Sequence, residues 1–172
     1  MNHKFYTGVG SRDTPDEILT LMTVIARKAY SEGLWLWSGG AEGADTAFEQ
    51  GAGDHKQIFL PWPGFGRKHG RIPHINDVPG PTEEAEAMAP LHHPAWDKCN
   101  ESGRLLHSRN CHQVLGLSLK CRTSGLICWT RRGKIVGGTG QALRIATDYS
   151  VPVLNLAIPK DLDEVLRWLK AA

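Results

Sequence analysis

The sequence predicts an α/β protein in which helices cover both faces of a mostly parallel sheet of about five to seven strands. Short apolar segments alternate with segments of helical periodicity, and glycine-rich stretches follow three of the apolar segments. The length of 172 residues is typical of a single domain. We therefore expect residues 1–172 to form one three-layer sandwich of helices, sheet and helices.

The N-terminal part alternates between strand and helix signals. We expect strands at residues 5–9, 34–37 and 57–60, a helix from about 14 to 33, and a helix that opens within 38–45 and ends near 51. Thr14 and Glu17 have the spacing of a capping box at the start of the first helix. Pro15 suits its first position and Gly33 suits its end.

The segment at 61–94 differs from its surroundings because it is rich in proline and glycine. We expect it to be an insertion or lid with one short helix over 82–88, since loops this long in compact domains are usually functional or mobile. Beyond it we expect a helix at 101–117, a strand at 125–130, a hairpin-like turn at 131–134, a helix at 141–149, a strand at 151–156 and a last helix from about 161.

Composition narrows the class of protein. The formal net charge of +2 is too small to indicate nucleic-acid binding by itself. No apolar run approaches the ~20 residues of a membrane span, and the N-terminus lacks a secretory signal, so we expect a cytoplasmic protein with no membrane partner. The cysteines and histidines show none of the paired short spacings of zinc sites, so we expect reduced thiols, no metal and no cofactor.

Three glycine-rich stretches each stand between an expected strand and an expected helix: GVGSR at 8–12, SGGAEGAD at 38–45 and VGGTG at 136–140. A helix N-terminus presents free N–H groups and the positive end of its dipole, and glycine lets a phosphate reach that backbone. In a parallel sheet such turns meet at the carboxyl ends of the strands, so together they predict a nucleotide or phosphate site. Any one of these stretches taken alone is better explained by a tight turn.

The candidate ligand-binding residues lie in these turns and on the expected helix at 101–117. They are Gly8, Gly10, Ser11, Arg12, Ser38, Gly39, Gly40, Gly43, Asp45, Arg109, Asn110, Gly137, Gly138, Thr139 and Gly140. Arginine pairs with phosphate through two parallel hydrogen bonds, which suits Arg12 and Arg109 to the role. Asp45 is suited to bind a ribose hydroxyl or to favour the start of its helix electrostatically.

The stretch SGGAEGADTA at 38–47 closely resembles the SGGA-x-GID-x-A stretch of DprA/Smf DNA-processing proteins, and GVGSR looks like their G-x-R opening. VGGTG is similar to the P-G-G-x-G-T motif of LOG (lysine decarboxylase-like) phosphoribohydrolases, and HSRN at 107–110 is similar to their H-x-R-K stretch. The chain therefore resembles the SLOG superfamily over nearly its whole length except 61–94, and its arrangement looks like a DprA-like family common in phage genomes. The resemblance implies a Rossmann-like fold, a bound nucleotide-derived small molecule, a homo-oligomer, and the host cytoplasm if the protein is phage-encoded.

Two other functions stay open. A LOG-like nucleoside monophosphate phosphoribohydrolase would use Arg109 to hold phosphate and Asp45 or Glu49 as the acid. The glutamate of the LOG motif is absent, because Arg144 stands in its place. A DprA-like single-stranded DNA-binding protein is the second alternative, although the mixed charges count against it. An apolar helix at 101–117 also favours an oligomer.

Overall fold

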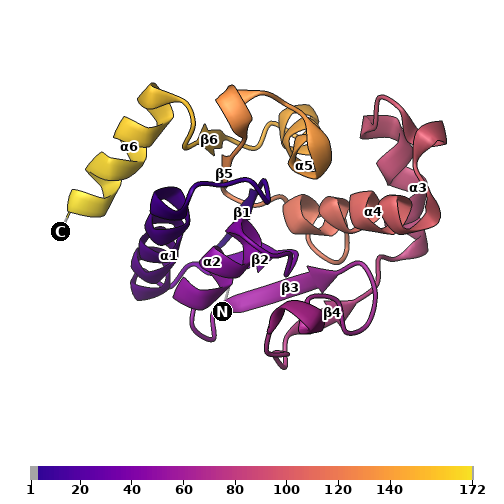
Figure 1. Cartoon of the computed structure of the whole chain (residues 1–172), viewed down its shortest axis with the longest axis horizontal. Coiled ribbons are helices and arrows are strands. Elements are labelled where there is room, and N and C mark those ends of the chain that lie inside the picture. The colour runs from indigo at the N-terminus through magenta and orange to yellow at the C-terminus, as the bar shows by residue number, and fades with distance from the viewer. Residues whose placement is uncertain (1–3, 172) are drawn as a thin grey trace.

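Six parallel strands form one sheet in the computed structural model, which describes residues 4–171 (Figure 1). The strands are β1 (Phe5–Gly10), β2 (Trp35–Ser38), β3 (Lys56–Leu60), β4 (Asp77–Pro79), β5 (Leu126–Trp129) and β6 (Val153–Asn155), in the spatial order β4-β3-β2-β1-β5-β6. The helices are α1 (Asp16–Ser31), α2 (Ala44–Gly51), α3 (Glu83–His92), α4 (Glu101–Leu115), α5 (Gly137–Asp148) and α6 (Pro159–Lys170). The predicted α/β class with a parallel sheet is confirmed.

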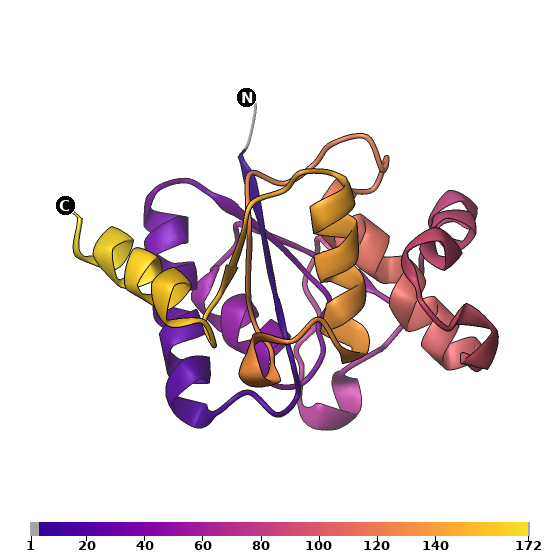
Figure 2. The ribbon, with the colours of Figure 1, turned by 90° about the horizontal axis from the view of Figure 1, so that it is seen from above.

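Helices cover both faces of the sheet, as the three-layer prediction requires. Helices α1, α2 and α6 lie on one face and α4 and α5 on the other, with α3 outside α4 (Figure 2). Each side has its own apolar core, in which Met22 and Phe48 are fully buried on the first side and Leu115 and Ile145 on the second. Within residues 4–171, no helix combines the length and the apolar character that a membrane span needs.

The predicted capping box at the start of α1 is wrong. The residue before the helix is Pro15, and no side chain caps the first turn. The Thr14 hydroxyl instead donates a hydrogen bond of 2.6 Å to the carbonyl oxygen of Ser11. Thr14 is buried, so this bond shapes the turn between β1 and α1 rather than the helix itself.

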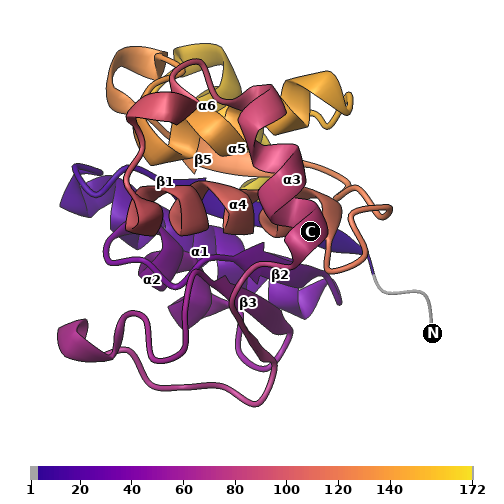
Figure 3. The same cartoon turned by 90° about the vertical axis from the view of Figure 1, so that its right-hand side faces the viewer.

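Residues 61–94 contribute to the sheet instead of forming only an insertion. Strand β4 lies within this segment and pairs in parallel with β3 at the sheet edge. The buried guanidinium of Arg71 donates to both carboxylate oxygens of Asp77 at 2.6 and 2.8 Å and to Glu49 of α2 at 2.9 Å. These bonds fasten the wide loop before β4 (Figure 3) to the rest of the molecule.

Helix α5 differs from its predicted boundaries, and helix α4 differs from its predicted environment. Helix α5 begins at Gly137, four residues earlier than expected at 141, so the third glycine-rich stretch is its first helical turn. Helix α4 packs against the sheet, α3 and α5. This packing accounts for its apolar residues within a single chain and removes the observation that favoured an oligomer.

Candidate functional site

The order of the strands opens a space above the carboxyl ends of β1 and β5. The chain runs outward from β1 through β2, β3 and β4, and then returns to β5 and β6 on the other side of β1. Strands β1 and β5 therefore lead to helices on opposite faces, which is the arrangement that separates their loops and creates a ligand crevice. A cavity of about 650 Å³ lies at this place, within the size range of small-molecule sites.

The three glycine-rich turns reach this one cavity. The predicted binding residues that line it are Gly10, Ser11, Arg12, Asp45, Arg109, Asn110, Gly137, Gly138 and Thr139. The predicted binding residues outside its lining are Gly8, Ser38, Gly39, Gly40, Gly43 and Gly140, and the candidate acid Glu49 is also outside it. The second turn thus contributes Asp45, together with Ala41, rather than its glycines.

Close packing explains why several positions outside the lining are glycines. A methyl group at Gly8 would lie 2.6 Å from the ring of Phe48, and one at Gly39 would overlap the guanidinium of Arg109. At Gly40, which has a φ of +68°, a methyl group would lie 2.9 Å from Nε of Arg71. The turn before α2 is therefore filled by side chains from distant parts of the chain.

The buried guanidinium of Arg109 occupies the floor of the cavity. Its Nη1 donates to Oδ2 of Asp45 at 3.3 Å. When the Gln113 amide is oriented to satisfy its neighbours, its oxygen accepts from Nη1 of Arg109 and from the backbone N–H of Gly39, both at 2.9 Å. The Nε–H of Arg109 is buried and has no partner among residues 4–171. Arg109 is thus a cation with a donor still unsatisfied.

Asp45 is the internal anion of the second turn. Its Oδ2 accepts from the backbone N–H of Ala41 at 3.3 Å as well as from Arg109. Burial raises the pKa of the Asp45 carboxyl, and the Arg109 charge opposes that shift. Because a carboxylate already stands in the first turn of α2, this helix N-terminus is partly neutralised before any ligand arrives.

The third turn, by contrast, is open. Apart from the turn's own backbone, no atom of residues 4–171 lies within 4 Å of the position that a methyl group would take at Gly137 or at Gly138. The residue before the helix, Val136, is extended and no side chain caps the first turn of α5. The amide nitrogen of Asn110 donates to the carbonyl oxygen of Gly138 at 2.9 Å, which fixes the turn against α4. The first N–H groups of a helix have no partner within the helix, and Gly137, Gly138 and Thr139, which carry these groups in α5, line the cavity.

The exposed rim of the cavity is formed by the first turn and by the segment after β5. Arg12 is exposed, and the Ser11 hydroxyl oxygen accepts from the backbone N–H of Asp13 at 3.2 Å. Arg131, which follows β5, donates to Asp13 at 3.1 Å. Arg12 therefore has its charge available beside the opening.

The candidate acid Glu49 and the residue at the position of the LOG glutamate both lie outside the cavity lining. Glu49 forms ion pairs with Arg71 at 2.9 Å and with Lys56 at 3.8 Å, away from the cavity lining. Arg144, at the position of the LOG glutamate, donates to the carbonyl oxygen of His92 at 2.6 Å and is also outside the lining. The carboxylates that do line the cavity are Asp13 and Asp45, and each contacts an arginine.

Sequence reasoning missed Gln113, which bridges the second turn and α4. Its position four residues after Arg109 places both side chains on the same face of one helix, so that spacing was the available signal. His107 was not among the predicted binding residues, yet it also lines the cavity. Burial and the charges of nearby groups lower the pKa of His107 to about 4, so its imidazole is neutral at pH 7.

Solved structures share this fold. DNA processing protein A from Helicobacter pylori, described for its single-stranded DNA binding mode, matches with a TM-score of 0.56 and 17% identity, over 99% of this chain and 74% of its own. The Moco carrier protein from Chlamydomonas reinhardtii matches with a TM-score of 0.54 and 15% identity, over 97% of this chain and 85% of its own. No protein-family model matches the chain, and no curated protein sequence matches it. The predicted Rossmann-like, DprA-like fold is confirmed.

Proposed function

We propose that the protein binds a nucleotide or a nucleotide-derived small molecule in the cavity between the ends of β1 and β5. The open first turn of α5 carries this proposal. Gly137 and Gly138 place no side chain over this turn, and no side chain of residues 4–171 caps its backbone N–H groups. An anion such as a phosphate is the group that such a turn binds best, because free N–H donors and the helix dipole act together.

The rest of the cavity supplies what a nucleotide needs beyond its phosphate. Arg12 and Arg109, which both line the cavity, add positive charge. The Asp45 carboxylate is an acceptor suited to a ribose hydroxyl. The apolar side chains of Val9, Leu106 and Val136 offer a wall for a base.

Binding is better supported than hydrolysis. Breaking an N-glycosidic bond requires a carboxyl group close to the developing oxocarbenium charge. Asp13 and Asp45 line the cavity, but both are engaged with arginines. The two structural neighbours, a single-stranded DNA-binding protein and a Moco carrier protein, are also binding proteins.

Calorimetric titration with the four nucleoside 5′-monophosphates tests the proposal. In Gly138→Ala a methyl group enters the space in front of the α5 turn, and we expect the affinity to fall about tenfold, the equivalent of one charge-assisted hydrogen bond. Gly125→Ala is the matched control. Gly125 lies just before β5, its φ is not in the left-handed region, and the added methyl group would have only an ordinary contact at 3.7 Å.

Equal affinity in the two variants, or the absence of nucleotide binding by the unaltered protein, would overturn the proposal. Chromatography of the same mixtures measures the release of free base, which we expect to be weak or absent. Binding of a single-stranded oligonucleotide without binding of mononucleotides would favour the DNA-binding alternative. The oligonucleotide titration is followed by fluorescence anisotropy at two salt concentrations, because phosphate contacts weaken with salt.

A further inference from the structure

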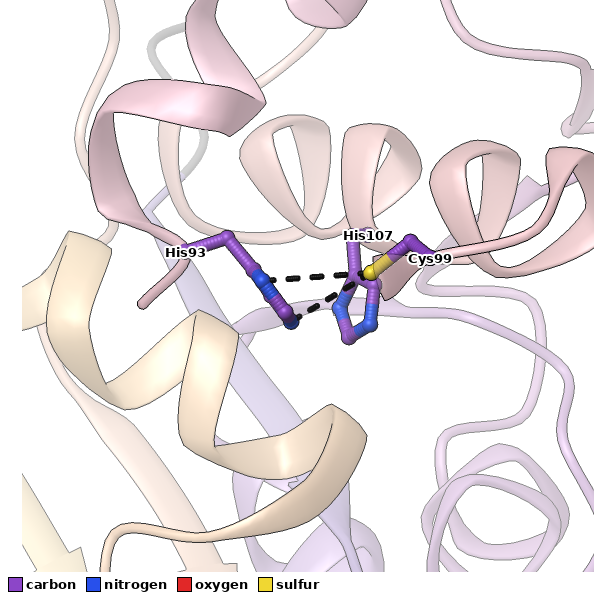
Figure 4. Close-up of side chains that lie close together, drawn as sticks. All are labelled: His93, Cys99 and His107. Carbon is purple, nitrogen blue, oxygen red and sulfur yellow. Dashed lines mark hydrogen bonds between the residues drawn. The ribbon is translucent and has the colours of Figure 1, made fainter. Parts of the chain in front are cut away.

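Three potential metal ligands from separate parts of the chain meet beside the proposed nucleotide cavity (Figure 4). His93 follows α3, Cys99 follows the short 3-10 helix at Trp96–Lys98, and His107 belongs to α4. One ligand atom from each residue lies within 4.8 Å of the others. The Cys99 Sγ is 3.8 Å from Nε2 and 3.9 Å from Nδ1 of His93. This His93–Cys99–His107 cluster has sequence spacings that the usual zinc motifs do not have.

We propose that the His93–Cys99–His107 cluster binds a divalent transition metal of the zinc type. Imidazole nitrogen and thiolate sulfur are the donors that zinc prefers, at about 2.0–2.1 and 2.3 Å. Tetrahedral coordination at those lengths separates the nitrogen and sulfur atoms by about 3.5 Å. The separations in the cluster exceed this value by at most about 1.3 Å, which rotations of three half-buried side chains remove.

An unsatisfied atom gives independent support. Nδ1 of His107 is buried and has no hydrogen-bond partner within residues 4–171. A buried ring nitrogen without a partner is costly, and a bound metal ion would satisfy it. Nδ1 of His93 accepts a hydrogen bond of 3.2 Å from the backbone N–H of Ala95. A metal bound at Nδ1 would take the lone pair that accepts this bond, and a metal bound at Nε2 would leave the proton on Nδ1. Either way this long hydrogen bond would be lost.

The three-residue ligand set, the adjacent cavity and the charge of Arg144 together indicate what kind of metal site this would be. Three ligands leave a fourth position for water, the arrangement found where zinc has an exchangeable site. His107 is also part of the nucleotide cavity wall, so the metal would lie next to that cavity. Burial, with a smaller contribution from the charge of Arg144, lowers the pKa of both His93 and His107. The same nearby charge opposes a cation and favours moderate rather than tight binding.

The competing explanation is a packed aromatic cluster. The His93 and His107 rings are 4.2 Å apart, Trp96 contacts both rings, and the Arg104 guanidinium lies 5.7 Å from the centroid of the Trp96 ring. Such a cluster needs the rings and not the thiol. Replacement of Cys99 by serine therefore separates the two explanations.

The test uses the full chain, freed of metal by a chelator and kept reduced. Zinc affinity is measured by competition with a chromophoric chelator, and the ligands are identified by the absorption spectrum of added Co²⁺. We expect one zinc ion per chain and a thiolate-to-cobalt charge-transfer band. In Cys99→Ser the band should disappear and the zinc affinity should fall about tenfold or more. His93→Gln should weaken zinc binding in the same way.

Cys121→Ser is the matched control, because Cys121 is a free and exposed cysteine that lies outside the cluster. It should retain the cobalt band and the zinc affinity. The metal-free unfolding midpoint of each variant shows that it folds. The proposal is overturned if the unaltered protein gives no thiolate-to-cobalt band, or if Cys99→Ser binds zinc as well as Cys121→Ser does. Neither readout depends on nucleotide binding.

Discussion

The turn before α2 is filled by the protein's own side chains, whereas the turn before α5 is empty. Around Gly39 and Gly40 the guanidinium groups of Arg109 and Arg71 occupy the space that side chains would need. Around Gly137 and Gly138, no atom of the described residues outside the turn's own backbone lies within 4 Å of that space. The first of these helices also carries its own anion, Asp45, and the second carries no acidic residue in its first turn.

This difference shows that glycine-rich turns of similar sequence can meet opposite physical needs. In the turn at 38–45, glycine permits close packing and positions a buried arginine at the cavity floor. In the turn at 136–140, glycine keeps the backbone accessible, and only this turn is both uncapped and open. The two turns should therefore respond differently to the same substitution.

The largest expected difference is in stability. In Gly39→Ala the new methyl group overlaps Nη1 of Arg109 and displaces it from Asp45. Disrupting a buried ion pair in this way should lower the free energy of unfolding by about 3 kcal/mol. Gly138→Ala should change it by about 1 kcal/mol or less, because its methyl group meets nothing. Urea unfolding measures both values, and equal losses would show that the two turns are packed alike.

A smaller effect separates backbone strain from packing within the open turn. Gly137 has a φ of +66°, so Gly137→Ala should cost about 1–2 kcal/mol although its methyl group has free space. Gly138 has no such φ and serves as the control. Thermal unfolding of the two variants measures the difference. A Gly137→Ala protein as stable as Gly138→Ala would mean that the turn adapts its backbone.

The smallest expected effect tests the internal anion. Removing the charge in Asp45→Asn should raise the affinity for inorganic phosphate about fivefold, or about 1 kcal/mol, because Arg109 and the start of α2 lose their competing carboxylate. Nucleoside monophosphates should gain less than inorganic phosphate if Asp45 also accepts a ribose hydroxyl. Calorimetry compares the two ligands, with circular dichroism to verify folding. Unchanged phosphate affinity would place the phosphate far from Asp45.

The sequence was sufficient for the fold and for the meeting of three turns, because alternation of strands and helices determines both. It was insufficient to predict which turn is filled by side chains and which is open. The turn at 38–45 is filled by Arg109, whose partner Asp45 is 64 positions away, and no local pattern records such a contact. Strand β4 was missed because a strand of three residues ending in proline has no periodicity. The predicted capping box failed because Thr14 bonds the preceding turn.

The sheet ends at both sides in very short strands. The edge strand β4 has three residues and includes Pro79, and the opposite edge strand β6 also has three residues. An exposed edge is a template on which another chain can add a strand, and short edges or proline blunt that template. Neither edge therefore favours joining two copies through a continuous sheet. If copies of this chain associate, we expect helices and loops to form the contact. The sheet that carries the cavity between β1 and β5 would then remain the six strands of one chain.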